Sequence, residues 1–151
     1  MKTRRVGEGT FAVVYEALDT SVEPPRRVAL KKIKLIRQEG SAPNGLDISA
    51  VRELKALRIL SGEPLHPNIA PLLDVFVPQT RSNSLGNLHF VLPFYDFDLE
   101  SMIKDTQIVF SPADIKCWMW MMLSGIDYCH ERDIIHRVSH YIIEILTFLI
   151  Y

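Results

Sequence analysis

Apolar and polar residues alternate along much of the first two thirds of the chain, in the pattern typical of β-strands. Residues 3–18 read as two such strands joined by a turn at Gly7-Glu8-Gly9. Three further segments, 28–36, 69–77 and 88–95, are rich in apolar and β-branched residues and are bounded by polar or proline-containing loops. The sequence therefore predicts five strands.

Three other segments have apolar residues at helical spacing. The first helix is expected over residues 47–60, with Asp47 as its N-cap. One side of this helix carries Val51, Leu54, Leu57 and Leu60. A short helix is expected over 98–105, where Asp98 can cap the first turn.

The third helix is expected over residues 111–131. It begins with Ser111 as cap, Pro112 at the first helical position and Asp114 at the third. Its predicted buried face consists of Ile115, Trp118, Met119, Met122, Leu123 and Ile126. Because strands and one helix come first and helices alone follow, we expect an α+β fold with a β-rich lobe before a helical lobe.

Composition narrows the class of protein without identifying it. The chain has 151 residues, 48% hydrophobic and 23% charged, with a net charge of -1. This balance argues against a nucleic-acid or membrane partner held by bulk charge. Cys117 and Cys129 fall in one predicted helix, about 18 Å apart, so they cannot pair there and a reducing compartment is the simplest interpretation.

The glycine turn is the first candidate for chemistry. Gly7 and Gly9 would let backbone N–H groups approach a phosphate, although an ordinary glycine hairpin has the same pattern. Ala12 stands where a third glycine would complete a dinucleotide-binding motif, and no helix is expected next. The dinucleotide interpretation therefore fails.

A lysine and a glutamate are the second candidate. Lys31 emerges from the apolar start of a predicted strand, and Glu53 lies in the middle of the first helix. Each could be an ordinary solvated residue. Alternatively, Glu53 pairs with Lys31 and fixes its ammonium group for contact with nucleotide phosphates.

Together these motifs resemble those of the protein kinases. The matching segments are GEGTFAVVY, VALKK, AVRE, HPNI and CHERDIIHR, in this order. The resemblance covers residues 2–137, roughly the first half of a kinase domain. It implies a kinase N-lobe and hinge over 2–95, with a five-stranded antiparallel sheet and one helix. An incomplete helical C-lobe would occupy 96–137, before an apolar tail, 138–151, that does not resemble the family.

The segments DISAVRELKALRIL and FSPADIKCWMWMMLSGIDYCHERDIIHR are most similar to the cyclin-dependent kinases of the CDK-activating type. That resemblance implies a serine/threonine kinase of the cell cycle and of transcription factor TFIIH, acting on the RNA polymerase II tail. It implies a cyclin bound through the helix around Asp47–Leu60 and a protein substrate, with no direct contact to nucleic acid or membrane. The expected location is the nucleus, with the cytoplasm as a second compartment.

The resemblance also implies roles for individual residues. Lys31 would hold ATP phosphates and pair with Glu53, while His136 and Arg137 would open the catalytic loop. The other residues expected at the ATP site are Val6, Gly7, Gly9, Val14, Ala29, Leu92, Pro93, Tyr95 and Asp98. Val14 and Ala29 would cover the adenine, and Leu92 would be the gatekeeper.

The resemblance stops at Arg137. Val138 replaces the aspartate that would orient the substrate hydroxyl and accept its proton. The asparagine and aspartate that would hold Mg²⁺ are also missing. We therefore expect an incomplete and inactive kinase. The apolar segment 141–151 resembles an aggregation-prone strand, although a buried terminal strand or helix has the same composition.

Two alternatives remain at this stage. The chain could be a non-catalytic module that binds a cyclin. It could also be the translation of a retained intron, because Val138-Ser139 can be encoded by a sequence with the form of a splice donor site and A-T-rich intron sequence encodes mainly apolar residues.

Overall fold

The computed structural model describes residues 2–35, 47–79 and 86–135. The chain divides into two compact units. The first consists of Met1–Leu57 with Leu72–Phe94, and the second of Arg58–Pro71 with Tyr95–Tyr151.

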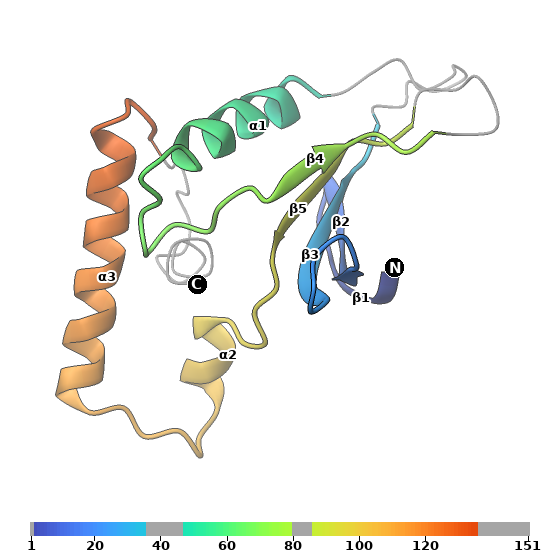
Figure 1. Ribbon diagram of the computed structural model, residues 1–151. Coiled ribbons are helices and arrows are strands. Elements are labelled where there is room, and N and C mark those ends of the chain that lie inside the picture. Colours follow the sequence, from blue (N-terminus) through green and yellow to red (C-terminus); the bar gives the residue numbers. More distant parts are fainter. Residues whose placement is uncertain (1, 36–46, 80–85, 136–151) are drawn as a thin grey trace. The chain divides into compact units, whose positions relative to one another are not determined.

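Five strands form one antiparallel sheet in the order β1-β2-β3-β5-β4 (Figure 1). Their bounds are β1 Lys2–Glu8, β2 Ala12–Asp19, β3 Arg26–Ile33, β4 Asp74–Phe76 and β5 His89–Pro93. The predicted α+β class, with a five-stranded antiparallel sheet followed by helices, is confirmed.

One face of this sheet is covered by α1, Ile48–Leu60. Register pairs Lys31 with both Val14 and Phe90, so all three side chains point to the same face. Phe90 has no exposed surface and packs in a cluster with Leu57 of α1. The cluster's other buried members are Ala12, Ile33, Ala50 and Leu88. Residues at alternate positions, Val28, Leu30 and Val91, pack with Ala17 in a second cluster.

Each helix begins where the sequence predicts a cap. Asp47 Oδ1 accepts a hydrogen bond from the backbone N–H of Ser49 (2.6 Å) just before α1. Asp98 caps α2, Leu99–Lys104, by accepting from the Ser101 backbone N–H. α3, Pro112–His130, starts with a capping box in which Ser111 and Asp114 each accept a bond from the other's backbone.

Several strand boundaries differ from those predicted, including that of β3, which ends at Ile33 and not at residue 36. β1 continues through Gly7 and Glu8, which pair with Val14 and Val13, so the turn lies after Glu8 and not at Gly7-Glu8-Gly9. β4 has only three residues, within the nine predicted. The segment before it contains two prolines, Pro67 and Pro71, which lack the N–H that a strand ladder requires.

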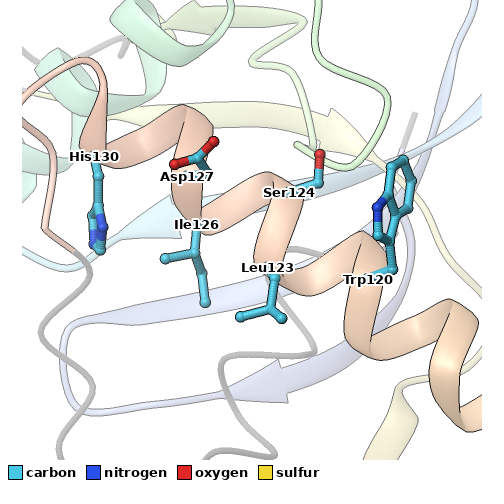
Figure 2. A pocket seen from close by; sticks show the side chains of 6 residues that line it. All are labelled: Trp120, Leu123, Ser124, Ile126, Asp127 and His130. Atoms are coloured by element: carbon cyan, nitrogen blue, oxygen red, sulfur yellow. The ribbon is translucent and has the colours of Figure 1, made fainter.

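The predicted buried face of α3 is partly wrong. Ile115, Met119 and Leu123 are exposed, Leu123 at the pocket of Figure 2, whereas Met122 is buried as expected. The buried stripe continues instead through Gly125 and Cys129, and Trp118 and Ile126 are partly buried. Because Gly125 and Cys129 are small, α3 can pack closely on the segment 61–71. Helical periodicity alone does not reveal this contact.

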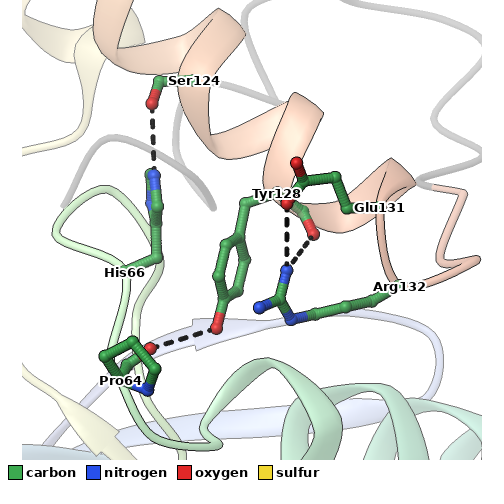
Figure 3. A network of polar contacts seen from close by, with 6 residues as sticks. All are labelled: Pro64, His66, Ser124, Tyr128, Glu131 and Arg132. Atoms are coloured by element: carbon green, nitrogen blue, oxygen red, sulfur yellow. Dashed lines mark hydrogen bonds and ion pairs between the residues drawn. The ribbon is translucent and has the colours of Figure 1, made fainter.

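A network of polar contacts joins that segment to α3 within the second unit (Figure 3). His66 Nε2 lies 3.1 Å from Ser124 Oγ, and Tyr128 donates from its hydroxyl to the Pro64 carbonyl (3.2 Å). Asn68 donates its backbone N–H to His66 Nδ1. The segment is thus attached to α3 at two points.

The cysteines are both unpaired, Cys117 exposed and Cys129 buried, as the predicted separation requires. Burial raises the pKa of the Cys129 thiol above its usual value. In the ranges 2–35, 47–79 and 86–135, no helix has both the length and the apolar character needed to cross a bilayer.

Candidate functional site

The turn between β1 and β2 is open and is supported from one side. An added Cβ at Gly7 or Gly9 would meet no atom within 4 Å, so the backbone there is accessible. Gly9 donates its N–H to the Ala12 carbonyl (2.9 Å). Lys34 donates its ammonium group to the Gly9 carbonyl (2.9 Å) and to the Glu8 carboxylate (2.7 Å). This support for the turn is not apparent from the sequence pattern.

Lys31 and Glu53 form an ion pair. Lys31 Nζ lies 2.5 Å from Glu53 Oε1, and the two side chains are 21% and 29% exposed. The pair forms because strand alternation points Lys31 to the face that α1 covers, and Glu53 lies in the middle of α1. The sequence left open whether Lys31 and Glu53 are solvated separately or paired, and in the structure they are paired. The contact fixes the position of the ammonium group.

A cavity of about 430 Å³ lies beside this pair and the glycine turn, within the first unit. Four of its lining residues are among those predicted: Gly9, Val14, Lys31 and Glu53. It is also lined by Thr10, Phe11, Ala12, Ile33, Asp47, Ser49 and Ala50. Hydrogen bonds from the Ser49 side chain and backbone lower the pKa of Asp47, so this carboxyl group is ionised at neutral pH. The cavity therefore combines an open backbone turn, a fixed cation and apolar walls.

The remaining predicted residues are placed as follows. Ala29 is paired with Leu92 across β3 and β5, and Pro93 ends β5. Val6 is exposed on β1. Tyr95 and Asp98 belong to the second unit, where the Asp98 carboxylate caps α2. His136, Arg137 and Val138 lie outside the described residues.

Burial raises the pKa of the Tyr95 phenol, so this group stays protonated at neutral pH.

Metal-binding side chains do not gather anywhere in the described part of the chain: no three His, Cys, Asp or Glu residues lie close enough to hold an ion.

The model of the protein kinase domain matches residues 1–137. The chain belongs to the protein kinase family. This kinase chain is 50% identical over 137 residues to the serine/threonine-protein kinase crk1 of Schizosaccharomyces pombe, an alignment that covers 91% of the chain and 36% of the relative. It is 44% identical to KIN28 of Saccharomyces cerevisiae over 136 residues, covering 90% and 39%.

It is also 44% identical to cyclin-dependent kinase 7 of Xenopus laevis over 132 residues, covering 87% and 34%. Among solved structures, the MAP kinase LmaMPK10 of Leishmania major matches with a TM-score of 0.69 and 27% identity, covering 93% of this chain and 40% of that one. The resemblance to cyclin-dependent kinases of the CDK-activating type is confirmed. The chain spans well under half the length of these curated relatives.

Proposed function

We propose that the cavity beside Lys31 is the phosphate end of an ATP site. The observation that supports this most directly is the 2.5 Å contact between Lys31 and Glu53 at the wall of a cavity that also includes Gly9. ATP supplies the phosphoryl group in this family. Here Lys31 would hold phosphate oxygens, the open backbone beside Gly9 would let the phosphates approach closely, and the other predicted residues of the first unit would bind the nucleoside.

ATP binding and the dependence of that binding on Lys31 provide the test. We expect Lys31→Met to weaken binding of ATP about tenfold or more, since a hydrogen bond to a charged group contributes roughly 1.5–3 kcal/mol. Lys32→Met is the matched control, because the adjacent side chain points to the opposite face of the sheet. Calorimetry with ATP measures both. Equal affinities for the two variants would contradict the proposal.

We further propose that the chain does not transfer the phosphoryl group. Val138 offers no carboxylate to orient and deprotonate a substrate hydroxyl. Residues 138–151 contain neither asparagine nor aspartate, so the groups that would hold Mg²⁺ in the family are lacking there. With Mg-ATP and an RNA polymerase II tail peptide, the expected rate equals the background. Turnover that Lys31→Met abolishes would refute this.

A cyclin is the partner that we propose for α1. This helix leaves apolar side chains exposed at Ile48, Val51 and Ile59, beside exposed Arg52 and Lys55. Exposed apolar residues bordered by charge are typical of an interaction surface. Val51→Asp should weaken binding to a panel of purified cyclins, whereas the control Ile103→Asp, on an exposed position of α2, should not. If both variants bind equally well, α1 is not the contact.

A chain that binds a cyclin without catalysis is the second candidate function, and the exposed face of α1 favours it. The transcriptional role with TFIIH and the nuclear location, with the cytoplasm as second compartment, remain proposals from the resemblance. Imaging of the tagged chain tests the location.

A retained intron from codon 138 onward is the alternative at the level of the gene. The family match ends at residue 137, next to the potential donor site at Val138-Ser139. We expect a spliced transcript in which Arg137 is followed by aspartate and then by a loop containing lysine and proline. Mature transcripts that read only through Val138 to Tyr151 would show that this alternative is wrong.

A further inference from the structure

Lys34, the residue directly after β3, contacts the turn between β1 and β2 at three points. Its backbone N–H donates to the Phe11 carbonyl (2.9 Å). Its ammonium group donates to the Gly9 carbonyl (2.9 Å) and to one oxygen of the Glu8 carboxylate (2.7 Å). The other oxygen of that carboxylate pairs with Arg5. Lys34 therefore connects the end of β3 to both sides of the turn.

Packing does little to fix the orientation of this turn. A Cβ added at Gly9 would meet no atom within 4 Å, and Phe11 is 62% exposed. Glycine also allows the backbone more orientations than any other residue does. The orientation of the turn is therefore set by its hydrogen bonds, and Lys34 supplies three of them.

The contact with the Gly9 carbonyl also directs the next N–H group. Lys31 and Ile33 line the cavity of the proposed ATP site, and strand alternation places Lys34 on the other face of the sheet. In a planar trans peptide the carbonyl and the N–H point in opposite directions. Because the Gly9 carbonyl points to Lys34, the Thr10 N–H points away from Lys34, and Thr10 lines the cavity.

We propose that Lys34 is a positioning residue for the phosphate end of the ATP site. It holds the Gly9–Thr10 peptide so that an N–H group faces the phosphates and the carbonyl oxygen does not. An N–H group stabilises a nearby anion, whereas a carbonyl oxygen in its place would repel it. This inference rests on the proposed function of the cavity. Lys34 acts through the backbone, since its own charge is matched by Glu8.

A nucleotide with phosphates should therefore depend on Lys34, and a nucleoside without them should not. Lys34→Met removes both side-chain contacts and leaves the backbone bond to Phe11 in place. A hydrogen bond of ordinary net strength changes an equilibrium by about two- to tenfold, so ATP should bind about two- to tenfold more weakly to this variant. Adenosine should bind to it as it does to the unaltered chain.

Two further variants separate positioning from a loss of charge. Lys32→Met, two residues earlier and on the same face as Lys34, removes the same charge and should change ATP affinity less than twofold. Lys34→Arg keeps donors for Gly9 and Glu8 and should retain most of the affinity. Calorimetry measures ATP binding to the full chain, and an NMR titration measures adenosine binding.

The outcomes distinguish this inference from the proposed function. If Lys31→Met weakens ATP binding while Lys34→Met matches Lys32→Met, the cavity binds ATP and the role of Lys34 is refuted. Equal losses of ATP and adenosine in Lys34→Met would also refute it, because they indicate a general structural defect. If Lys31→Met has no effect, the proposed function fails and this inference fails with it.

NMR relaxation of the nucleotide-free chain tests the restraint itself. The N–H groups of Gly9 and Thr10 should be more mobile in Lys34→Met than in Lys32→Met, and Lys34→Arg should restore their order. Identical relaxation in Lys34→Met and Lys32→Met would show that Lys34 does not hold the turn.

Discussion

Gly125 provides a quantitative test of how α3 packs on the segment 61–71. A Cβ at this position would lie 3.2 Å from the Asn68 carbonyl oxygen and 3.5 Å from Ile69 Cδ1. The distance to the oxygen is shorter than an ordinary contact, so the segment would have to move by a few tenths of an ångström. That movement is opposed by the bonds from His66 to Ser124 and from Tyr128 to Pro64.

Two effects of Gly125→Ala have opposite signs. Alanine stabilises a helix interior by about 1 kcal/mol relative to glycine. Overpacking a tight contact costs roughly 1–3 kcal/mol. Because the segment is attached at two points, we expect the cost to exceed the gain and the local free energy of opening to fall by about 1 kcal/mol. Gly125→Val, with two more methyl groups and a β-branched side chain, should lower it by roughly 3 kcal/mol.

Amide hydrogen exchange of α3 measures this free energy directly. Cys117→Ala is the control, because position 117 is exposed on the same helix and alanine there raises the helix propensity without overpacking. This variant should slow amide exchange in α3 slightly. If Gly125→Ala protects α3 as much as Cys117→Ala does, Asn68 yields to the new methyl group and the close contact is not a constraint.

Three further predictions concern the sheet and the start of α3. Phe90→Ala should destabilise the sheet by about 3–5 kcal/mol in urea unfolding, while Phe76→Ala, on the exposed edge strand, should cost much less. Ser111→Ala should cost about 1 kcal/mol of helix stability, seen as faster exchange in the first turn of α3. Hydrogen bonds from Ser111 lower the pKa of Asp114 below its usual 3.8, so the contribution of this carboxylate is fully present above that pH and disappears as pH falls through the lowered pKa. An NMR titration should give a pKa below 3.8 that Ser111→Ala raises.

Features that depend on a few neighbouring residues could be predicted from the sequence. The caps at Asp98 and Ser111 need only a side-chain acceptor three residues before a free N–H, and both occur as predicted. Strand alternation likewise predicts which side chains share a face. The Lys31–Glu53 contact joins residues 22 positions apart, so the sequence could propose it but could not choose it over two solvated side chains.

Features that depend on what an element packs against could not be predicted. Helical spacing shows that α3 has apolar sides, but it does not show which side is covered. Gly125 and Cys129 are buried because the segment 61–71 lies against them, while the larger Leu123 is exposed. The bond from Lys34 to the Gly9 carbonyl could not be predicted for a similar reason, since it requires the turn to be in place.

Nucleotide binding and turnover should separate in this chain, because they depend on different segments. Under the proposed function, Lys31 and the glycine turn would bind the nucleotide phosphates and Glu53 would hold Lys31 in place. Binding alone does not accelerate a chemical step. Acceleration requires groups that act on the transition state, and in this family these follow Arg137, where Val138 stands. ATP binding that depends on Lys31, without turnover, is therefore the combined expectation. If neither occurs while a cyclin still binds α1, the module that binds a cyclin without catalysis becomes the better account.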